Sequence, residues 1–136
     1  MDSLVIKPPF QKITESSRLY VADAGPKGRG VFAGRAFKKG EIVESCPIIP
    51  WEQEELYRLS GHLLERYVFL WDKRNKSLAV VLGFGSLYNH SSQPNCGYSR
   101  QIKNRLIVFK AKRAIGPHEE LTIHYGPSAA SFHEIP

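Results

Sequence analysis

The sequence is poor in cysteine and contains no long apolar run, and both absences exclude whole classes of protein. Its 136 residues include two cysteines, Cys46 and Cys96, fifty positions apart. Two isolated thiols build neither a disulfide framework nor a zinc site, so we expect reduced thiols and no bound metal. No stretch approaches the ~18 apolar residues of a membrane span, and the first residues lack the apolar run of a signal peptide. We therefore expect an intracellular protein without membrane contact, in a nucleus or a bacterial cytoplasm.

Acidic residues are the minority, yet they gather in one segment. The chain has 19 Lys+Arg and 13 Asp+Glu, a net charge of +6. Between Glu41 and Asp72 seven acids accompany two bases, a local balance of −5, so the other residues carry +11. Tyr98 to Arg113 holds six bases and no acid. These segments are either solvated faces or an acidic surface for a basic ligand beside a basic surface for an anion, and both interpretations stay open.

The length and composition predict one mainly β domain. Hydrophobic residues make up 42% of the chain, which suffices for a core, and no linker or repeat divides it. Short apolar runs between Gly- and Pro-rich turns predict strands, and the residues KNR join two of them as a hairpin. The predicted strands are Leu19–Ala22, Val31–Phe37, Ile42–Ile49, Ser77–Leu82, Gly97–Ile102, Leu106–Ala111 and Leu121–Tyr125.

One helical insertion is expected, over Pro50–Asp72. Pro50 suits a helix start, and Ser60-Gly61 is expected to divide the segment into two short helices. Apolar residues with a spacing of three and four predict one buried helical face, formed by Leu56, Leu59, Leu63, Tyr67 and Leu70.

Three short motifs are the candidates for chemistry. The first, Gly28-Arg29-Gly30, precedes a strand, whereas a dinucleotide-binding fingerprint precedes a helix, so a Rossmann site is excluded. Taken alone, this motif is typical of a tight turn. Glycines at these positions would also let a ligand approach the backbone closely.

The second motif is G-S-L-Y-N-H-S-S-Q-P-N, from Gly85 to Asn95. It has no G-x-S-x-G elbow, and His90 lies too close to Ser91 in sequence to serve as the base of a hydrolase triad. His90 also lacks further ligands at metal spacing. A turn capped by Asn and Ser side chains is the plain alternative.

The third motif, E-E-L-T-I-H-Y-G, begins at Glu119 and predicts a strand entering a turn. In this order, G-R-G-V-F-A, N-H-S-x-x-P-N and E-E-L-T-I-H-Y-G resemble the sequence signatures of SET-domain protein-lysine methyltransferases, especially the small free-standing members. The resemblance covers about residues 18–127, the core of a single domain that spans residues 1–136 with a tail at 128–136.

The resemblance implies a fold of several small β-sheets (a β-clip) with a C-terminal pseudoknot. It also implies S-adenosyl-L-methionine as cofactor. By motif position, the backbone of Gly28, Arg29 and Gly30 would contact the methionine part, Asn89 the amino-acid end, and the His90 backbone the adenine edge. Tyr125 aligns with the catalytic tyrosine of the family, and it also borders the cofactor.

The lysine amine must lose a proton before it attacks the sulfonium methyl. A pKa of ~10.4 makes this cost on the order of 4–5 kcal/mol at pH 7, which a sulfonium cation and an apolar channel would reduce. Tyr125 would stay protonated, so we expect it to orient the amine rather than act as a base. The residues expected at the substrate channel are Tyr88, Ile123 and Phe132.

The chain departs from the family pattern at three positions. Ser92 stands where many members have a zinc-binding Cys, so Phe132 or a second subunit in a homodimer is expected to close the channel. Ile123 offers no hydroxyl to hold a water that would limit methylation to one step, so we expect more than one methyl transfer. His124 replaces a frequent Asp, and we expect it to be an exposed strand residue.

The expected substrate is a basic protein, such as a histone tail or another Lys-rich segment, drawn to the acidic insertion. The basic hairpin would contact nucleic acid only secondarily. Two alternatives remain: an inactive SET-fold module that binds basic peptide or nucleic acid, and a small basic β-domain that binds nucleic acid.

Overall fold

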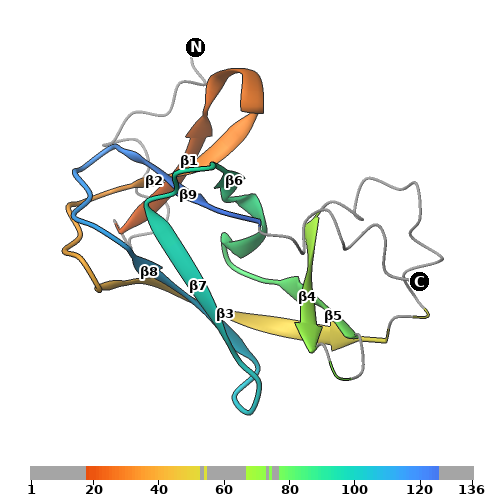
Figure 1. Cartoon of the computed structure of the whole chain (residues 1–136). Helices are drawn as coiled ribbons and strands as arrows, with labels where there is room; N and C mark the ends of the chain where they lie inside the picture. The colour runs from red at the N-terminus through yellow and green to blue at the C-terminus, as the bar shows by residue number, and fades with distance from the viewer. Residues whose placement is uncertain (1–17, 53, 55–66, 73, 75–76, 126–136) are drawn as a thin grey trace.

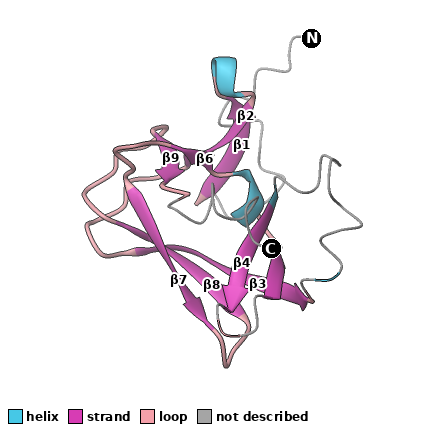
Figure 2. Cartoon of the chain, turned by 45° about the vertical axis from the view of Figure 1, so that its right-hand side comes forward, coloured by secondary structure: helices cyan, strands magenta, loops and turns pink. Residues whose placement is uncertain are grey.

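The structure, a computed structural model, describes residues 18–52, 54, 67–72, 74 and 77–125. Strands dominate this part of the chain, and short 3-10 turns lie at Gly25–Lys27 (η2) and Gly85–Leu87 (η5). The strands form two sheets, which Figure 1 and Figure 2 show as an upper and a lower group. No helix within the described ranges is long and apolar enough to cross a membrane.

The smaller sheet has the order β1-β2-β9-β6. Its strands are Leu19–Asp23 (β1), Arg29–Ala33 (β2), Glu120–Ile123 (β9) and Asn89–His90 (β6). β1 and β2 form a hairpin through η2, and β6 pairs with β9 in parallel, Asn89 opposite Thr122 and His90 opposite Ile123. This pairing brings the second and third sequence motifs side by side, as the expected pseudoknot requires.

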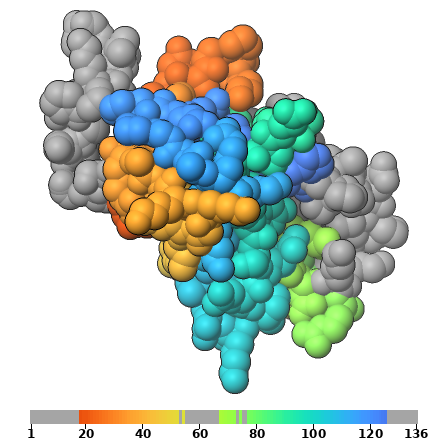
Figure 3. All heavy atoms as spheres, turned by 60° about the vertical axis from the view of Figure 1, so that its left-hand side comes forward, coloured from red at the N-terminus to blue at the C-terminus, as the bar shows by residue number. Residues whose placement is uncertain are grey.

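The larger sheet has the order β4-β5-β3-β8-β7. Its long strand β3 (Ile42–Trp51) pairs with both β5 and β8. The flanking strands are Val68–Asp72 (β4), Ser77–Val81 (β5), Cys96–Gln101 (β7) and Leu106–Ala111 (β8). β7 and β8 form the hairpin predicted through KNR, and its tip extends away from the rest of the molecule (Figure 3).

One hydrophobic core joins the two sheets. From Cys46 to Ile49, β3 alternates as a half-buried strand should, with Cys46 and Ile48 buried and Ile49 exposed. Nearer its start the register shifts between Ile42 and Glu44, and Val43 is the buried residue there. The core also takes buried side chains from both sheets, among them Val31, Leu121, Ile123, Val81, Ile107 and Phe109. The expected mainly β fold of several small sheets is confirmed.

The helix expected over Pro50–Asp72 is wrong at both ends. Pro50 and Trp51 belong to β3, and Val68–Asp72 forms β4 rather than the last turn of a helix. β4 is packed on both faces, since Phe69 contacts the main core while Val68 and Leu70 pack on Leu78. A strand packed on both faces has a continuous run of apolar residues, and such a run can imitate helical spacing. Positions 55–66 of the predicted helix lie outside the described residues.

The predicted strand Val31–Phe37 ends early. β2 stops at Ala33, and the chain then bends, so that Phe37 forms an isolated bridge with Ile115 instead. Phe37 is nevertheless buried, and the Arg35 guanidinium lies 4.3 Å from the centre of its ring.

Candidate functional site

The turn at Gly28-Arg29-Gly30 approaches β6 closely. Gly28 has φ 84° and ψ −140°, a conformation essentially restricted to glycine, and its carbonyl accepts a hydrogen bond from the Ala24 amide at 2.7 Å. At Gly30, a β carbon would lie 2.5 Å from Glu120 Oε2 and 2.8 Å from Asn89 Nδ2. Glycine at position 30 therefore lets the turn lie against both side chains.

The side chain of Asn89 is fixed by two acceptors. Its Nδ2 donates to the Arg29 carbonyl at 3.0 Å and to Glu120 Oε2 at 2.8 Å, while Lys27 Nζ donates to Glu120 Oε1 at 3.0 Å. Because both amide hydrogens are used, the amide orientation is determined and Oδ1 is presented as an acceptor. Within the part of the chain that the structure describes, no donor is recorded for this oxygen.

The imidazole of His90 binds the backbone of the third motif. Its Nδ1 accepts a hydrogen bond from the Tyr125 amide at 3.0 Å, so the neutral ring carries its proton on Nε2. The Ser91 amide donates to the Ile123 carbonyl at 2.9 Å and continues the contact beyond the two-residue strand. The rings of His124 and Tyr125 lie 4.6 and 5.1 Å from that of His90. His124 is exposed, as expected, but it follows β9 rather than lying within it.

The phenol of Tyr125 reaches back to the second motif. Its hydroxyl donates to the Tyr88 carbonyl at 2.9 Å, and the residue is 37% exposed. Partial burial, with a smaller contribution from the charge of Tyr67, raises the pKa of Tyr125 above its ordinary value. The hydroxyl is therefore protonated at neutral pH, as expected, and it is the donor in the bond to the Tyr88 carbonyl.

The residues expected at a substrate channel differ in placement. Tyr88 is 1% exposed, and its hydroxyl donates into the core, to Glu44 Oε1 at 2.7 Å, so what it presents to Tyr125 is its carbonyl. Ile123 is fully buried in β9 beside His90. Phe132 lies outside the described residues.

Comparison with known proteins decides the family. The profile of the SET domain matches residues 28–126, and these include all three motifs. The chain belongs to the SET-domain family. The resemblance drawn from the motifs is therefore confirmed.

This SET domain is 35% identical over 112 residues to the Schizosaccharomyces pombe histone-lysine N-methyltransferase described as H3 lysine-37 specific, covering 81% of this chain and 74% of that protein. It is 34% identical over 134 residues to the Arabidopsis thaliana histone-lysine N-methyltransferase ATX2, covering 90% of this chain but 12% of the relative. A crystal structure of a Plasmodium falciparum protein assigned as a histone methyltransferase superposes with a TM-score of 0.68 at 32% identity, covering 82% of this chain and 95% of that one. The expected enzyme class, protein-lysine N-methyltransferase, is thus confirmed at the level of the family.

Two residues that hold the site together were not predicted from the sequence. Asn95 is 3% exposed, donates from Nδ2 to the Glu120 carbonyl at 2.8 Å, and accepts from the Thr122 amide at 2.8 Å. Glu120 binds Asn89 and Lys27, as described above. Both lie inside the motifs of this SET domain, but only the fold reveals which backbone groups they meet.

The cysteines and acids of the SET domain offer no metal site within the described ranges. Cys46 and Cys96 are buried free thiols, and desolvation raises their pKa values, that of Cys96 to about 12. They are inert core residues rather than reactive thiols.

The acidic segment is already partly neutralised inside the protein. Arg35 binds Glu41 at 2.8 Å and Arg74 binds Asp72 at 3.1 Å, and in each case the hydrogen bond from that arginine lowers the pKa of the carboxyl. Glu44 accepts hydrogen bonds from the protein itself. Among the described residues, the acids of this segment without a recorded partner are the exposed Glu52 and Glu54.

Proposed function

We propose that this chain is an S-adenosyl-L-methionine-dependent protein-lysine N-methyltransferase with Tyr125 as its catalytic side chain. The observation that carries the proposal is the position of the Tyr125 hydroxyl, held by the Tyr88 carbonyl where β6 and β9 meet. The second and third motifs converge there, and Asn89 links them to the first.

The residues of the first two motifs fit the amino-acid end of the cofactor. The unpartnered Oδ1 of Asn89 is a suitable acceptor for an ammonium group, and the absence of a β carbon at Gly30 lets the Asn89 amide lie against the turn. We assign the backbone of Gly28, Arg29 and His90 to further contacts with the cofactor. When bound, the cofactor supplies the methyl group on a sulfonium centre.

Tyr125 would act on the substrate lysine by orientation. Because its hydrogen is directed to the Tyr88 carbonyl, the phenol has a fixed orientation, and a side chain held in this way can keep the attacking amine in line. A raised pKa makes Tyr125 a poor general base, so the lysine must lose its proton elsewhere. Partial burial of the site favours the neutral amine, since a desolvated ammonium is disfavoured.

The substrate we propose is a lysine of a basic protein, with a histone as the first candidate. Histone substrates are named for the relatives, and the exposed Glu52 and Glu54 offer charge for attracting a basic segment. The basic hairpin residues Lys103, Arg105 and Lys110 are exposed and would meet nucleic acid in a nucleoprotein substrate. Such substrates favour a nuclear location.

The test is methyl transfer by the wild type and by Tyr125→Phe. Each protein is incubated with labelled S-adenosyl-L-methionine and core histones, labelled lysines are identified by mass spectrometry, and cofactor affinity is measured by calorimetry. We expect transfer by the wild type and a loss of about 100-fold or more in the variant, with cofactor affinity retained. Cofactor binding without any transfer by the wild type would favour the inactive binding module instead.

The same spectra count the methyl groups. Ile123 places a buried aliphatic side chain, without a hydroxyl, two residues before Tyr125. We propose that di- or trimethyl-lysine accumulates on long incubation, and monomethyl product alone would contradict this.

A further inference from the structure

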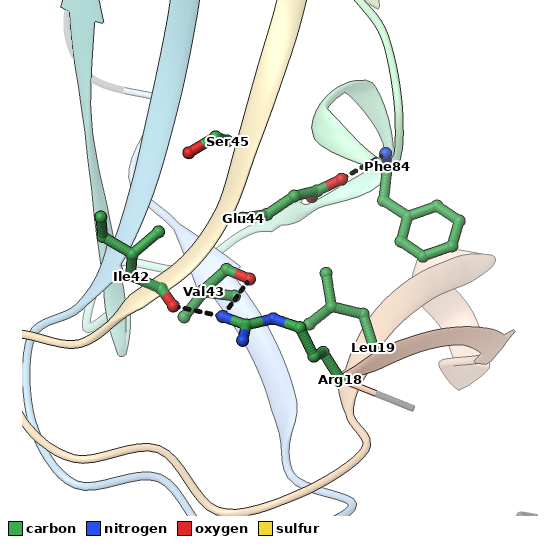
Figure 4. A pocket seen from close by; sticks show the side chains of 7 residues that line it. All are labelled: Arg18, Leu19, Ile42, Val43, Glu44, Ser45 and Phe84. Atoms are coloured by element: carbon green, nitrogen blue, oxygen red, sulfur yellow. Dashed lines mark hydrogen bonds between the residues drawn. The ribbon is translucent and has the colours of Figure 1, made fainter. Parts of the chain in front are cut away.

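The carboxylate of Glu44 binds both ends of the segment Phe84–Tyr88. Its Oε2 accepts a hydrogen bond from the Phe84 amide at 2.9 Å, and its Oε1 accepts one from the Tyr88 hydroxyl at 2.7 Å. Figure 4 shows the side chain reaching from β3 toward Phe84. Glu44 thus connects the long strand of the larger sheet to the turn that precedes β6.

Two glycines allow this close approach. Gly83 has φ +67°, and a β carbon there would lie 2.6 Å from Glu44 Oε2. At Gly85 a β carbon would overlap the Val81 side chain and lie 3.1 Å from Cys46 Sγ. The spacing G-F-G in the sequence is therefore required by the carboxylate and by the core beneath the turn.

Tyr88 connects Glu44 to the candidate site. Its ring is stacked on Phe109, with centroids 4.3 Å apart and planes 4° from parallel, and its hydroxyl is held by Glu44. With the side chain clamped at both the ring and the hydroxyl, the backbone of Tyr88 has little freedom. Its carbonyl is the group that accepts the Tyr125 hydroxyl at 2.9 Å.

We propose that Glu44 is a positioning residue for Tyr125, which it orients through Tyr88. This inference rests on the proposed function. Glu44 touches neither cofactor nor substrate in this role; it fixes the acceptor that directs the Tyr125 hydroxyl. Loss of one of its two bonds leaves a buried donor unsatisfied and lets the segment Phe84–Tyr88 shift.

The experiment introduces Glu44→Gln into the wild type and into Tyr125→Phe. Glutamine keeps the shape of the side chain, but its amide has one acceptor oxygen, so either the Phe84 amide or the hydrogen of the Tyr88 hydroxyl is left without an acceptor. In the wild type we expect kcat to fall about tenfold, with KM for core histones and cofactor affinity changed less than twofold. In the Tyr125→Phe background we expect no further fall, because no hydroxyl remains to be positioned.

The matched control is Glu41→Gln, the same chemical change at a surface ion pair with Arg35. It should leave kcat within twofold of the wild type. An equal fall of kcat for Glu44→Gln in both backgrounds would show a merely structural role and overturn the inference.

If circular dichroism shows that Glu44→Gln does not fold, Tyr88→Phe tests the same prediction. It removes the hydroxyl and keeps the ring on Phe109. Its effect on kcat must also vanish in the Tyr125→Phe background, and persistence there overturns the inference. A wild type that transfers no methyl group would overturn the proposed function itself. Methyl transfer by the wild type, together with an equal fall of kcat for the variant in both backgrounds, would overturn only the role of Glu44.

Discussion

The two sheets of this SET domain are held in different ways. The larger one is built around the ten-residue strand β3, and its Cys46, Ile107 and Phe109 are fully buried in the core. The smaller one includes the two-residue strand β6, whose ladder has few backbone hydrogen bonds. Side chains of the motifs, among them Asn89 and Asn95, add hydrogen bonds that hold this sheet together. The shared core, to which the larger sheet contributes more residues, therefore supplies most of the stability, and polar side chains of the smaller sheet fix the geometry of the site.

The largest effect on stability is expected in the larger sheet. Phe109→Ala removes a fully buried ring that stacks on Tyr88, and it should lower the free energy of unfolding by about 3–5 kcal/mol. Urea unfolding followed by fluorescence measures this. Ile49→Ala, at a 53% exposed position of β3, is the control and should change it by less than about 0.5 kcal/mol. Equal effects would contradict the assignment of the core.

A smaller loss of stability is expected at Asn95. Alanine there leaves the Thr122 amide and the Glu120 carbonyl without partners, at a cost of about 2–3 kcal/mol. Because these bonds hold β9, cofactor affinity measured by calorimetry should also fall, whereas Phe109→Ala should reduce it only through unfolding. Asn104→Ala, at the exposed hairpin tip, is the control. Unchanged cofactor affinity in folded Asn95→Ala would break the distinction between the sheets.

The smallest effect is expected at the surface pair of Arg113 and Glu119, 2.8 Å apart. A hydrogen bond from the Gly116 amide, with help from Arg113 and Asn95, lowers the pKa of Glu119. A lowered pKa stabilises the fold above the ordinary carboxyl pKa, and this contribution is lost as pH falls through the lowered value. With 36% of the side chain exposed, Glu119→Gln should cost less than about 1 kcal/mol at pH 7.

Urea unfolding of the wild type and of Glu119→Gln over a series of pH values measures this difference, which should shrink on acidification. The exposed Glu52 serves as control, since Glu52→Gln should match the wild type throughout. A difference that grows as pH falls would contradict the direction of the pKa shift.

The sequence could predict what depends on neighbouring residues, but not what depends on contacts between distant ones. Local patterns sufficed for the β7–β8 hairpin and for most strands, and the three motifs pointed to residues that meet at the site. The end of the segment Pro50–Asp72 was mistaken for a helix because β4, a strand packed on both faces, repeats apolar residues as closely as a helix does. Glu44 could not be found, because its contact with Tyr88 joins residues 44 positions apart. Tyr88 itself was expected at the channel, but the register of the turn directs its ring into the core.

The most direct test of the account is cofactor affinity in Gly30→Ala, measured by calorimetry with S-adenosyl-L-methionine. A β carbon at Gly30 would lie 2.5 Å from Glu120 Oε2 and 2.8 Å from Asn89 Nδ2, so it should displace the amide assigned to the cofactor. Gly97→Ala is the matched control, since its β carbon would meet Lys112 at an ordinary 3.6 Å. We predict that Gly30→Ala weakens binding at least tenfold while Gly97→Ala binds as the wild type does. Wild-type affinity in a folded Gly30→Ala would contradict the placement of the cofactor beside Asn89.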